Sequence, residues 1–281
     1  MKTPILARLL QFATRLYPIE RGKFKILTTI YFRYCAPGNP LLLLSNLSFG
    51  IRMRLDIHEF LQAHLFLYGS YELPTIRYIR SVIRSGDAAF DVGAQIGYLT
   101  LAMATAANKG ATVHAFEPES HNLERLRANL ALNPGVNVTV VDKAASNVNG
   151  TLRLYLSNDH NAGTHSTVAG GMNVSSAFVE IPSVTIDDYV RDNGITSLRL
   201  IKIDVEGGEL EVIKGAEHTL HTLRPIIVME MSDALQAARG FTTTEFKNLL
   251  ASMGYSSHVI LDDGTLKPSS VDEGHAMENV V

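Results

Sequence analysis

The stretch "AAFDVGAQIGYLTLAMA" (Ala88–Ala104) decides the fold class. It begins as a short apolar run, typical of a buried strand, which reaches Asp91 and Gly93. Gly93 and Gly97 let the backbone turn sharply, and a helical pattern follows from Gly97. A buried strand followed directly by a helix predicts one βα unit, the repeating element of a parallel sheet.

The same alternation continues along the chain as far as residue 262. We expect strands at 88–94, 111–118, 136–146, 198–206, 225–231 and 255–262, helices at 97–108, 119–132, 208–223 and 242–253, and further extended pieces at 152–157 and 178–186. The sequence therefore predicts an α/β fold with a doubly wound, mostly parallel, seven-stranded Rossmann-like sheet.

An N-terminal α/β extension is expected to precede this domain. Residues 1–17 have the pattern of an amphipathic helix, with Leu6, Leu9, Leu10, Ala13 and Leu16 on one face. A strand or short helix is predicted at 24–35, a half-buried strand at 50–57, and helices at 58–67 and 75–85. The predicted organisation is an extension at 1–70, a catalytic-type domain at 71–265 and a polar tail at 266–281.

Composition favours a cytoplasmic protein. Among the 281 residues there is a single cysteine, Cys35, and no run of about 18 apolar residues that could span a membrane. Charge is uneven, because residues 1–54 carry nine Lys or Arg and one acid, a net +8, against −11 for the rest. This asymmetry predicts either peripheral contact of residues 1–17 with the inner face of an anionic membrane or a basic cap packed on an acidic domain.

Acidic residues stand at the ends of three successive predicted strands. They are Asp91, Glu117 and Asp142, at the sheet edge where ligands bind in open α/β folds. Glu117 is placed to hold ribose hydroxyls, and Asp142 to accept a hydrogen bond from an adenine amino group. The alternative, which suits Asp142 best, is that such acids cap the helices that follow. The Gly93–Gly97 spacing is G-x-x-x-G rather than G-x-G-x-x-G, which argues against a nicotinamide dinucleotide.

These motifs together resemble a known family. "GSYELPTIRYIRSVIRSGDAAFDVGAQIGYLTLAMA", "VHAFEPESHNLERLRANLALN", "VVDKAAS" and "LIKIDVEGGELEVIKGAE" look like the FkbM family of class I S-adenosylmethionine-dependent methyltransferases, in order and spacing. The resemblance covers about residues 50–254 and departs at Gln95, where the family usually has asparagine.

The resemblance implies methyl transfer from S-adenosyl-L-methionine to an oxygen, usually a hydroxyl of a sugar, polyketide or other metabolite. Gly93, Ala94, Gln95 and Gly97, together with Asp91, would then lie at the methionine part of the cofactor. Glu117 would hold the ribose, and Asp142, Lys143 and Ala144 would border the adenine. Tyr71 and Glu72 would close over the amino-acid end.

The segment "LIKIDVEGGELEVIKGAE" (Leu200–Glu217) supplies the catalytic candidates. Lys202, Asp204 and Glu206 share one parity on a strand, and charges on a central strand are best accommodated at its carboxyl end. We expect Asp204 and Glu206 to contact the substrate hydroxyl or the cofactor, with Lys202 able to pair with either. The alternative is a purely structural network of lysine and carboxylates.

Two further residues are catalytic candidates. Glu230 lies near the end of the next strand, where it could join Asp204 in placing a base or binding a cation. His165 lies in a loop expected over the same edge and is a candidate general base. Carboxylates without a firm histidine partner do not predict a metal.

Three other functions compete with O-methylation of a small-molecule or glycan hydroxyl. An RNA methyltransferase could use a basic N-terminal segment, but the acidic domain and the absence of an Asn/Asp-Pro-Pro-Tyr motif argue against nucleic acid. A nicotinamide-dependent oxidoreductase lacks its glycine fingerprint here. A degenerate binding module would not need the intact set of glycines and acids.

Overall fold

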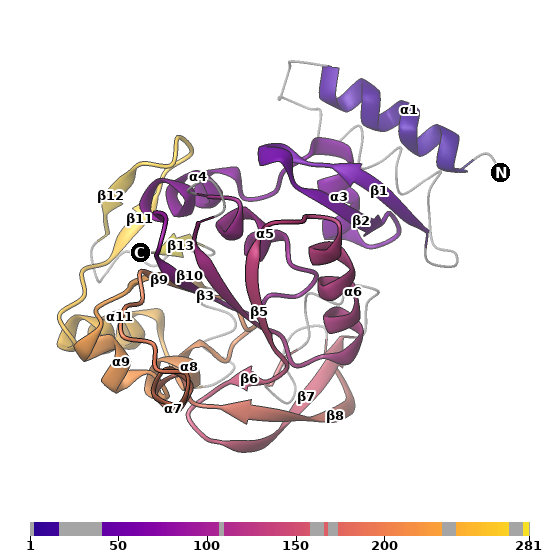
Figure 1. Cartoon of the computed structure of the whole chain (residues 1–281). Helices are drawn as coiled ribbons and strands as arrows, with labels where there is room; N and C mark the ends of the chain where they lie inside the picture. Colours follow the sequence, from indigo (N-terminus) through magenta and orange to yellow (C-terminus); the bar gives the residue numbers. More distant parts are fainter. Residues whose placement is uncertain are drawn as a thin grey trace. The chain divides into compact units, whose positions relative to one another are not determined.

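The computed structural model of the chain contains two compact units, Met1–Glu72 and Leu73–Val281. The structure describes residues 3–16, 41–106, 110–157, 166–167, 174–231, 240–269 and 278–280. The observed boundary after Glu72 lies close to the predicted one after residue 70. Figure 1 shows the helices and strands of both units.

The N-terminal unit combines helices with a small hairpin. Its elements are α1 (Thr3–Leu16), β1 (Leu42–Asn46), a short 3-10 helix (Ser48–Gly50), β2 (Arg52–Asp56) and α3 (Phe60–Tyr68). Strands β1 and β2 pair antiparallel, with Leu42 opposite Asp56. Met53 and Leu55 on β2 are fully buried and alternate with exposed arginines, so the predicted half-buried strand is confirmed. The predicted strand or helix at 24–35 lies outside the described residues.

The second unit is built on one twisted sheet with strand order β12-β11-β13-β10-β9-β3-β4-β5. Its members are β3 (Ala88–Val92), β4 (Thr112–Phe116), β5 (Asn137–Val141), β9 (Leu200–Ile203), β10 (Ile226–Met231), β11 (His258–Ile260), β12 (Leu266–Pro268) and β13 (Glu278–Val280). The strands from β10 to β5 run parallel, and the other three pair antiparallel. The predicted mostly parallel α/β fold is confirmed, with eight strands in the described part of the chain rather than seven.

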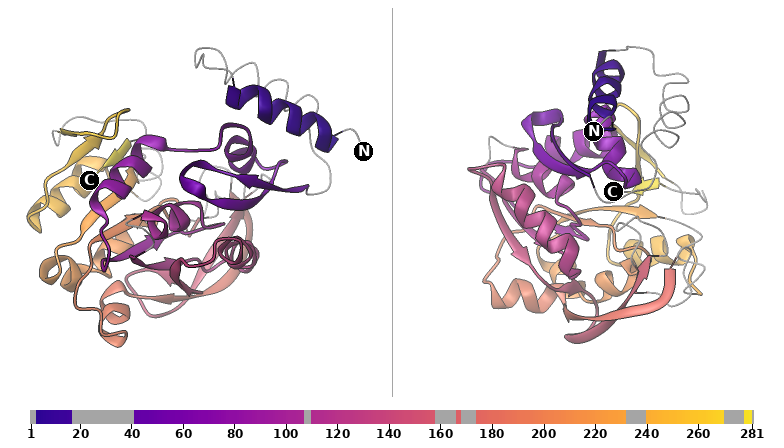
Figure 2. Two further views of the ribbon diagram at one scale, coloured as in Figure 1. Left: turned by 45° about the horizontal axis from the view of Figure 1, so that its top comes forward. Right: turned by 90° about the vertical axis from the view of Figure 1, so that its right-hand side faces the viewer.

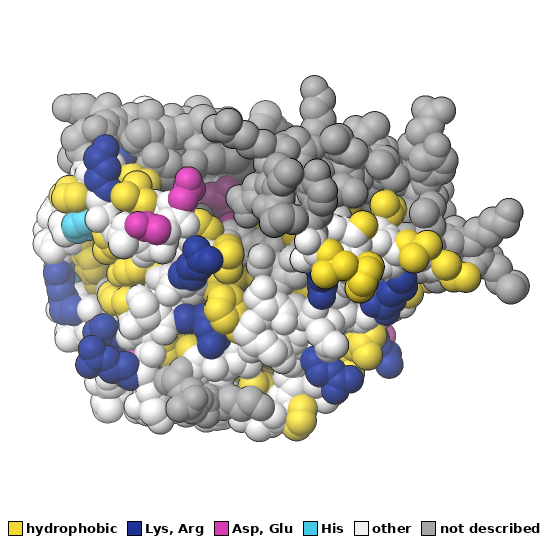
Figure 3. Space-filling model, turned by 90° about the horizontal axis from the view of Figure 1, so that it is seen from above, with side chains coloured by type: hydrophobic (Ala, Val, Ile, Leu, Met, Phe, Trp, Pro, Cys, Tyr) yellow, Lys and Arg dark blue, Asp and Glu magenta, His cyan; other side chains and the backbone are white. Residues whose placement is uncertain are grey.

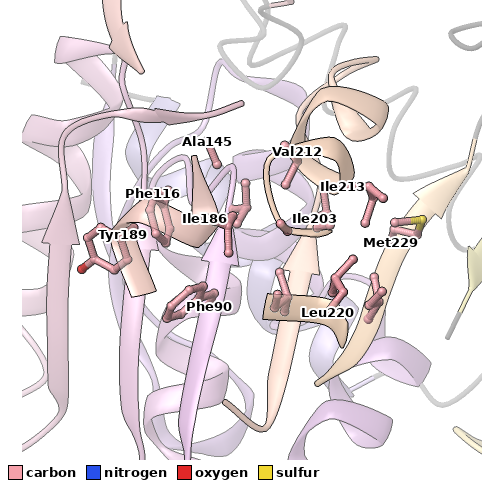
Figure 4. Close-up of a cluster of buried hydrophobic side chains, with 14 of the residues drawn as sticks. Phe90, Phe116, Ala145, Ile186, Tyr189, Ile203, Val212, Ile213, Leu220 and Met229 are labelled. Atoms are coloured by element: carbon pink, nitrogen blue, oxygen red, sulfur yellow. The ribbon is translucent and has the colours of Figure 1, made fainter. Parts of the chain in front are cut away.

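Helices cover both faces of this sheet (Figure 2). They are α4 (Leu73–Val82), α5 (Tyr98–Ala104), α6 (Ser120–Ala131), α7 (Ile186–Asp192), α8 (Glu209–Lys214), α9 (Glu217–Thr222) and α11 (Thr243–Ser252). Phe90 and Val92 point into the core shared with α7, α8, α9 and α11, while Ala89 points into the core shared with α4 and α5. Figure 4 shows the first core, where Tyr189, Ile213 and Leu220 pack on the strands. Because both faces of β3 are buried, apolar residues occupy successive positions of this strand instead of alternating with polar ones.

A separate three-stranded sheet lies after β5 in the chain. It consists of β6 (Ala144–Ala145), β7 (Gly150–Ser157) and β8 (Val174–Val184), in the order β6-β8-β7. Strands β7 and β8 form an antiparallel hairpin in which Leu152 faces Ile181. The extended pieces predicted at 152–157 and 178–186 are therefore strands, but they belong to this second sheet.

Two features differ from the predictions. The single helix expected at 208–223 is two helices, α8 and α9, separated at Gly215. A Cβ at Gly215 would lie 2.0 Å from the Ser146 carbonyl oxygen, so this close backbone approach is where the helix breaks. The expected polar tail at 266–281 contributes β12 and β13 to the main sheet. These strands are three residues long and β12 is exposed throughout, so they leave no apolar periodicity to detect.

Candidate active site

The turn after β3 brings backbone from two strands into close contact. Gly93 has φ 87°, and a Cβ there would lie 1.8 Å from the Asp204 carbonyl oxygen. The Gly93 and Ala94 N–H groups both donate to the Phe116 carbonyl, at 3.0 and 2.9 Å. Gly97, with φ 89°, precedes helix α5. The glycine signal thus reflects a backbone crossing at which only glycine fits.

Asp91 lies beneath this turn and is fully buried. Its Oδ2 accepts a hydrogen bond from the Thr100 hydroxyl at 2.5 Å, and it stands opposite Lys202 on β9. Burial raises the pKa of Asp91, and the charge of Lys202 opposes that shift. Oδ1 has no hydrogen-bond partner in the described part of the chain. Asp91 does not line the pocket described below, and its predicted cofactor contact stays a prediction.

Glu117 follows β4 and is nearly buried, with 4% of its surface exposed. Its two carboxylate oxygens accept backbone hydrogen bonds from Gln95 at 2.8 Å and from Glu119 at 2.9 Å. Burial raises the pKa of Glu117 to about 7, against the opposing effect of these bonds. The Asn122 side chain also hydrogen-bonds to this carboxylate, so three donors leave it one lone pair for a further hydroxyl group.

The residues predicted to border the adenine do not all face the pocket. Asp142 is exposed, and its carboxylate lies 3.9 Å from the Arg127 guanidinium. Lys143 is also exposed, whereas Ala144 lines the pocket. Of these three, the structure brings Ala144 alone to the pocket wall.

A largely buried ion pair lies at the carboxyl end of strand β9. Lys202 Nζ lies 2.9 Å from Asp204 Oδ2, with only 5% of the lysine side chain exposed. The Asp204 N–H donates to the Val92 carbonyl at 3.0 Å, which fixes this residue beside the turn after β3. A charged pair held by two neighbouring strands is a preorganised feature of the pocket floor.

Glu206 occupies the corner between β9 and α8 in a left-handed conformation, with φ 51°. Its carbonyl accepts a hydrogen bond from the Ser166 hydroxyl at 2.6 Å. Burial raises the pKa of Glu206 to about 8, and the nearby carboxylates of Asp204, Glu230 and Glu209 add to the shift. Glu206 is therefore the titratable group of this corner that responds near neutral pH.

A pocket at the ends of β3, β4 and β9 joins these groups. Its wall includes Gly93, Gln95, Glu117, Ala144, Asp204 and Glu206 from the predicted set. The wall does not include six other predicted residues, which are Asp91, Ala94, Gly97, Asp142, Lys143 and Glu230. The structure therefore brings six predicted residues together, from four segments distant in the sequence.

Two predicted residues do not belong to the described part of the second unit. His165 lies outside the described residues, so its expected part in proton removal stays a prediction. Glu72 is the last residue of the N-terminal unit and has φ 46°. Its contact with the cofactor is likewise a prediction.

The sequence patterns missed one wall of the pocket. Leu152 and Leu154 on β7 and Ile181 on β8 provide its apolar side, and Thr167 adds a hydroxyl. Leu154 and Ile181 are 6% and 3% exposed. The alternation of apolar residues on β7 marks a buried face, but a strand pattern does not reveal what that face covers.

Glu119 was also missed. It caps helix α6 by accepting the N–H groups of His121 and Asn122, and it lines the pocket as well. Glutamate is not among the residues preferred as helix N-caps, so the sequence pattern does not single out this position.

The charge of the pocket decides which cofactor fits. In the described residues its wall contains five carboxylates and no Lys, Arg or His; the acids are Glu117, Glu119, Asp204, Glu206 and Glu211. A dinucleotide brings a pyrophosphate, which this wall would repel. S-adenosylmethionine carries a positive sulfonium and an ammonium group, and the carboxylates suit both.

Comparisons with known proteins found similar methyltransferases. The chain is 30% identical to the hexuronic acid methyltransferase AglP of Haloferax volcanii over 157 residues, which are 56% of this chain and 61% of that protein. It is 31% identical to the 31-O-demethyl-FK506 methyltransferase FkbM of Streptomyces tacrolimicus over 195 residues, covering 57% of this chain and 74% of that one. A solved S-adenosylmethionine-dependent methyltransferase from Agrobacterium tumefaciens aligns over 88% of this chain and 71% of its own, with 10% identity and a TM-score of 0.46.

The family is shown by a match over the catalytic-type domain. The description "Methyltransferase FkbM domain" matches residues 91–257, more than half of the chain. This confirms the predicted family, the enzyme class and S-adenosylmethionine as the methyl donor of that family. The chain belongs to the FkbM family of methyltransferases.

Proposed function

We propose that this protein is an S-adenosylmethionine-dependent O-methyltransferase that acts on a hydroxyl group of a glycan or secondary metabolite. The observation that supports this most is the pocket wall, which combines the Gly93 turn with five carboxylates and, among the described residues, no cationic side chain. The name of one curated relative, the 31-O-demethyl-FK506 methyltransferase, fits transfer to an oxygen of a metabolite, and the name of the other, a hexuronic acid methyltransferase, fits a sugar-derived acceptor.

The proposed cofactor site uses both backbone and carboxylates. Glu117 accepts a ribose hydroxyl with the lone pair that its two backbone donors and the Asn122 side chain leave over. Gly93 and Gln95 present backbone to the methionine part, and Ala144 packs against the adenine side. Bound there, S-adenosylmethionine supplies a methyl carbon already activated by its positive sulfur.

The proposed chemical step relies on the β9 corner. Asp204, fixed by Lys202 and by the Val92 carbonyl, orients the acceptor hydroxyl. Glu206 would accept the hydroxyl proton while the methyl group passes to the hydroxyl oxygen, so that the donor's S–C bond breaks as the C–O bond forms and the donor leaves as the neutral thioether, S-adenosylhomocysteine. The pKa of about 8 makes Glu206 a better base than an ordinary carboxylate, and a bound sulfonium favours its ionised form.

The acidic wall also bears on the acceptor. An acceptor with its own carboxylate would meet Glu119 and Glu211 in the same pocket, where like charges repel, and no cationic side chain of the described wall would pair with it. We therefore expect an uncharged hydroxyl compound to be preferred over a hexuronic acid. The same repulsion argues against a phosphate-rich RNA acceptor.

A methyl-transfer assay with labelled S-adenosylmethionine tests this function. A panel of neutral glycosides, the matched hexuronic acids and polyketide alcohols serves as acceptors. Label should enter at least one neutral acceptor, and Glu206→Gln should lower kcat about a hundredfold or more. Glu217→Gln on the exposed start of α9 is the matched control.

Calorimetry with S-adenosylhomocysteine separates the two parts of the proposal. Failure to bind it would exclude the cofactor assignment. Binding without transfer to any hydroxyl, combined with transfer to the carboxylate of a hexuronic acid in the panel, would exclude O-methylation of an alcohol.

A further inference from the structure

Helix α1 packs on the rest of its unit through a face of small and polar side chains, whereas an ordinary amphipathic helix buries its large apolar side chains. The buried side chains are Ala7, Gln11 and Thr14, with 0%, 9% and 1% of their surfaces exposed. Gln11 Nε2 donates to Ser45 Oγ at 2.9 Å and to the Phe66 carbonyl at 2.8 Å. Small and polar residues, joined by hydrogen bonds, therefore make the inner face.

The outer face of α1 carries the large apolar side chains. Ile5, Leu9, Phe12 and Leu16 are 66%, 62%, 66% and 65% exposed. Their spacing of four, three and four residues puts them in one continuous stripe along the helix. The apolar face predicted from the sequence consisted of Leu6, Leu9, Leu10, Ala13 and Leu16. The stripe is rotated from that expectation, because hydrogen bonds to α3 and β1 set the inward side.

The surroundings of the stripe are apolar and basic. Leu42 and Leu44 on β1 are 48% and 39% exposed, and the Arg8 guanidinium donates to the Leu44 carbonyl at 2.6 Å. Arg15 donates to the Asn46 carbonyl at 2.7 Å. Figure 3 shows hydrophobic side chains next to Lys and Arg side chains on one face of the molecule.

Charge decides which partner suits this surface. The sequence of α1 contains Arg8 and Arg15 and no acid, within a 54-residue segment of net charge +8. A second copy of the chain would bring two basic surfaces together, which costs free energy. An anionic lipid surface satisfies both properties, since it attracts the arginines and accepts the apolar stripe.

We propose that α1 docks the protein on an anionic membrane, lying in the plane of the interface with Ile5, Leu9, Phe12 and Leu16 inserted among the lipids. The geometry is that of a helix lying on a bilayer rather than crossing it. At 14 residues α1 is about 21 Å long, shorter than the hydrocarbon core. In the described residues no helix combines the length and the apolar character that crossing a membrane requires.

Vesicle flotation with the full chain tests the proposal. The probes are vesicles of phosphatidylcholine alone and of phosphatidylcholine with phosphatidylglycerol. Wild type should float with the anionic vesicles and much less with the neutral ones. Leu9→Ser/Phe12→Ser should weaken that binding at least about tenfold, because two inserted apolar side chains are lost.

A matched control removes exposed apolar groups elsewhere. Leu261→Ser/Leu266→Ser changes two side chains that are 40% and 36% exposed in the other unit, and it should bind vesicles like wild type. Because residues 9 and 12 are exposed, their variant should keep the wild-type melting temperature and S-adenosylhomocysteine binding.

Three results would overturn the docking surface. One is a wild-type protein that does not float with the anionic vesicles. Another is a Leu9→Ser/Phe12→Ser variant that binds them as tightly as wild type. A third is a wild-type dimer in sedimentation velocity that the same variant dissociates, which would assign the stripe to a second copy.

Discussion

At the scale of single residues, Glu206 links the structure to pH. Its carboxylate has a pKa of about 8 in the folded protein, above the usual 4.5, chiefly because it is buried among other acids. A raised pKa means that the folded state holds the proton more tightly than the unfolded state. The corresponding stability is present at low pH and is lost as pH rises from about 4.5 through about 8.

Glu206→Gln should therefore change the pH dependence of unfolding. The variant cannot ionise here, so it should match wild type near pH 5 and exceed it by on the order of 1–3 kcal/mol at pH 9. Urea unfolding at several pH values, without cofactor, measures the difference. A stability gap that stays constant from pH 5 to 9 would contradict the assignment.

Gly93 gives a second prediction at this scale. Alanine there meets the Asp204 carbonyl oxygen and also needs φ 87°, so Gly93→Ala should cost about 3 kcal/mol or more and abolish S-adenosylhomocysteine binding. Gly86→Ala is the matched control, because Gly86 has φ 89° but a Cβ added there would have no other atom within 4 Å. It should cost only about 1 kcal/mol from backbone strain. Equal losses in the two variants would show that the close contact does not matter.

At the scale of elements, the parallel strands and their helices were predictable because burial on both faces leaves unbroken apolar runs. Phe90 and Ala89 serve opposite cores, yet both are apolar, and this is the pattern that the sequence displays. The break between α8 and α9 was not predictable. It depends on the Ser146 carbonyl next to Gly215, which lies far away in the chain.

The candidate site was predictable only where a strand end carries a charged side chain. Glu117, Asp204 and Glu206 are such cases, and all three line the pocket. Asp142 has the same signal but turns outward to Arg127. Leu152 and Ile181 gave no signal, because packing of one sheet over another is a tertiary property.

Helix α11 offers a prediction about elements. Thr242 and Glu245 form a reciprocal capping box, with Glu245 Oε2 accepting the Thr242 N–H at 2.8 Å and Thr242 Oγ1 accepting the Glu245 N–H at 3.1 Å. Thr242→Ala should lower the free energy of unfolding by about 1 kcal/mol, measured by urea denaturation. Thr222→Ala at the exposed end of α9 should change it by less than about 0.5 kcal/mol. Indistinguishable midpoints for the two variants would contradict the role of the cap.

At the scale of the whole molecule, the basic segment and the acidic pocket belong to different units. The basic segment belongs to the N-terminal unit, and the carboxylates of the pocket wall belong to the unit that starts at Leu73. The sequence showed this asymmetry through counts alone. It could not show that the large apolar side chains of α1 face away from the unit, because that depends on which helix face finds hydrogen-bond partners.

The placement of β13 has a consequence for biosynthesis. Residues 278–280 lie between β10 and β11, pairing Glu230 with Asn279 and Val259 with Val280. Before residues 278–280 have been synthesised, β10 has an unpaired edge of apolar sequence, and the β11–β12 hairpin has no neighbouring strand in the sheet. The sheet is completed only after residue 280 has left the exit tunnel. Until then the nascent chain offers β10 as a site for chaperones or for mispairing with another chain.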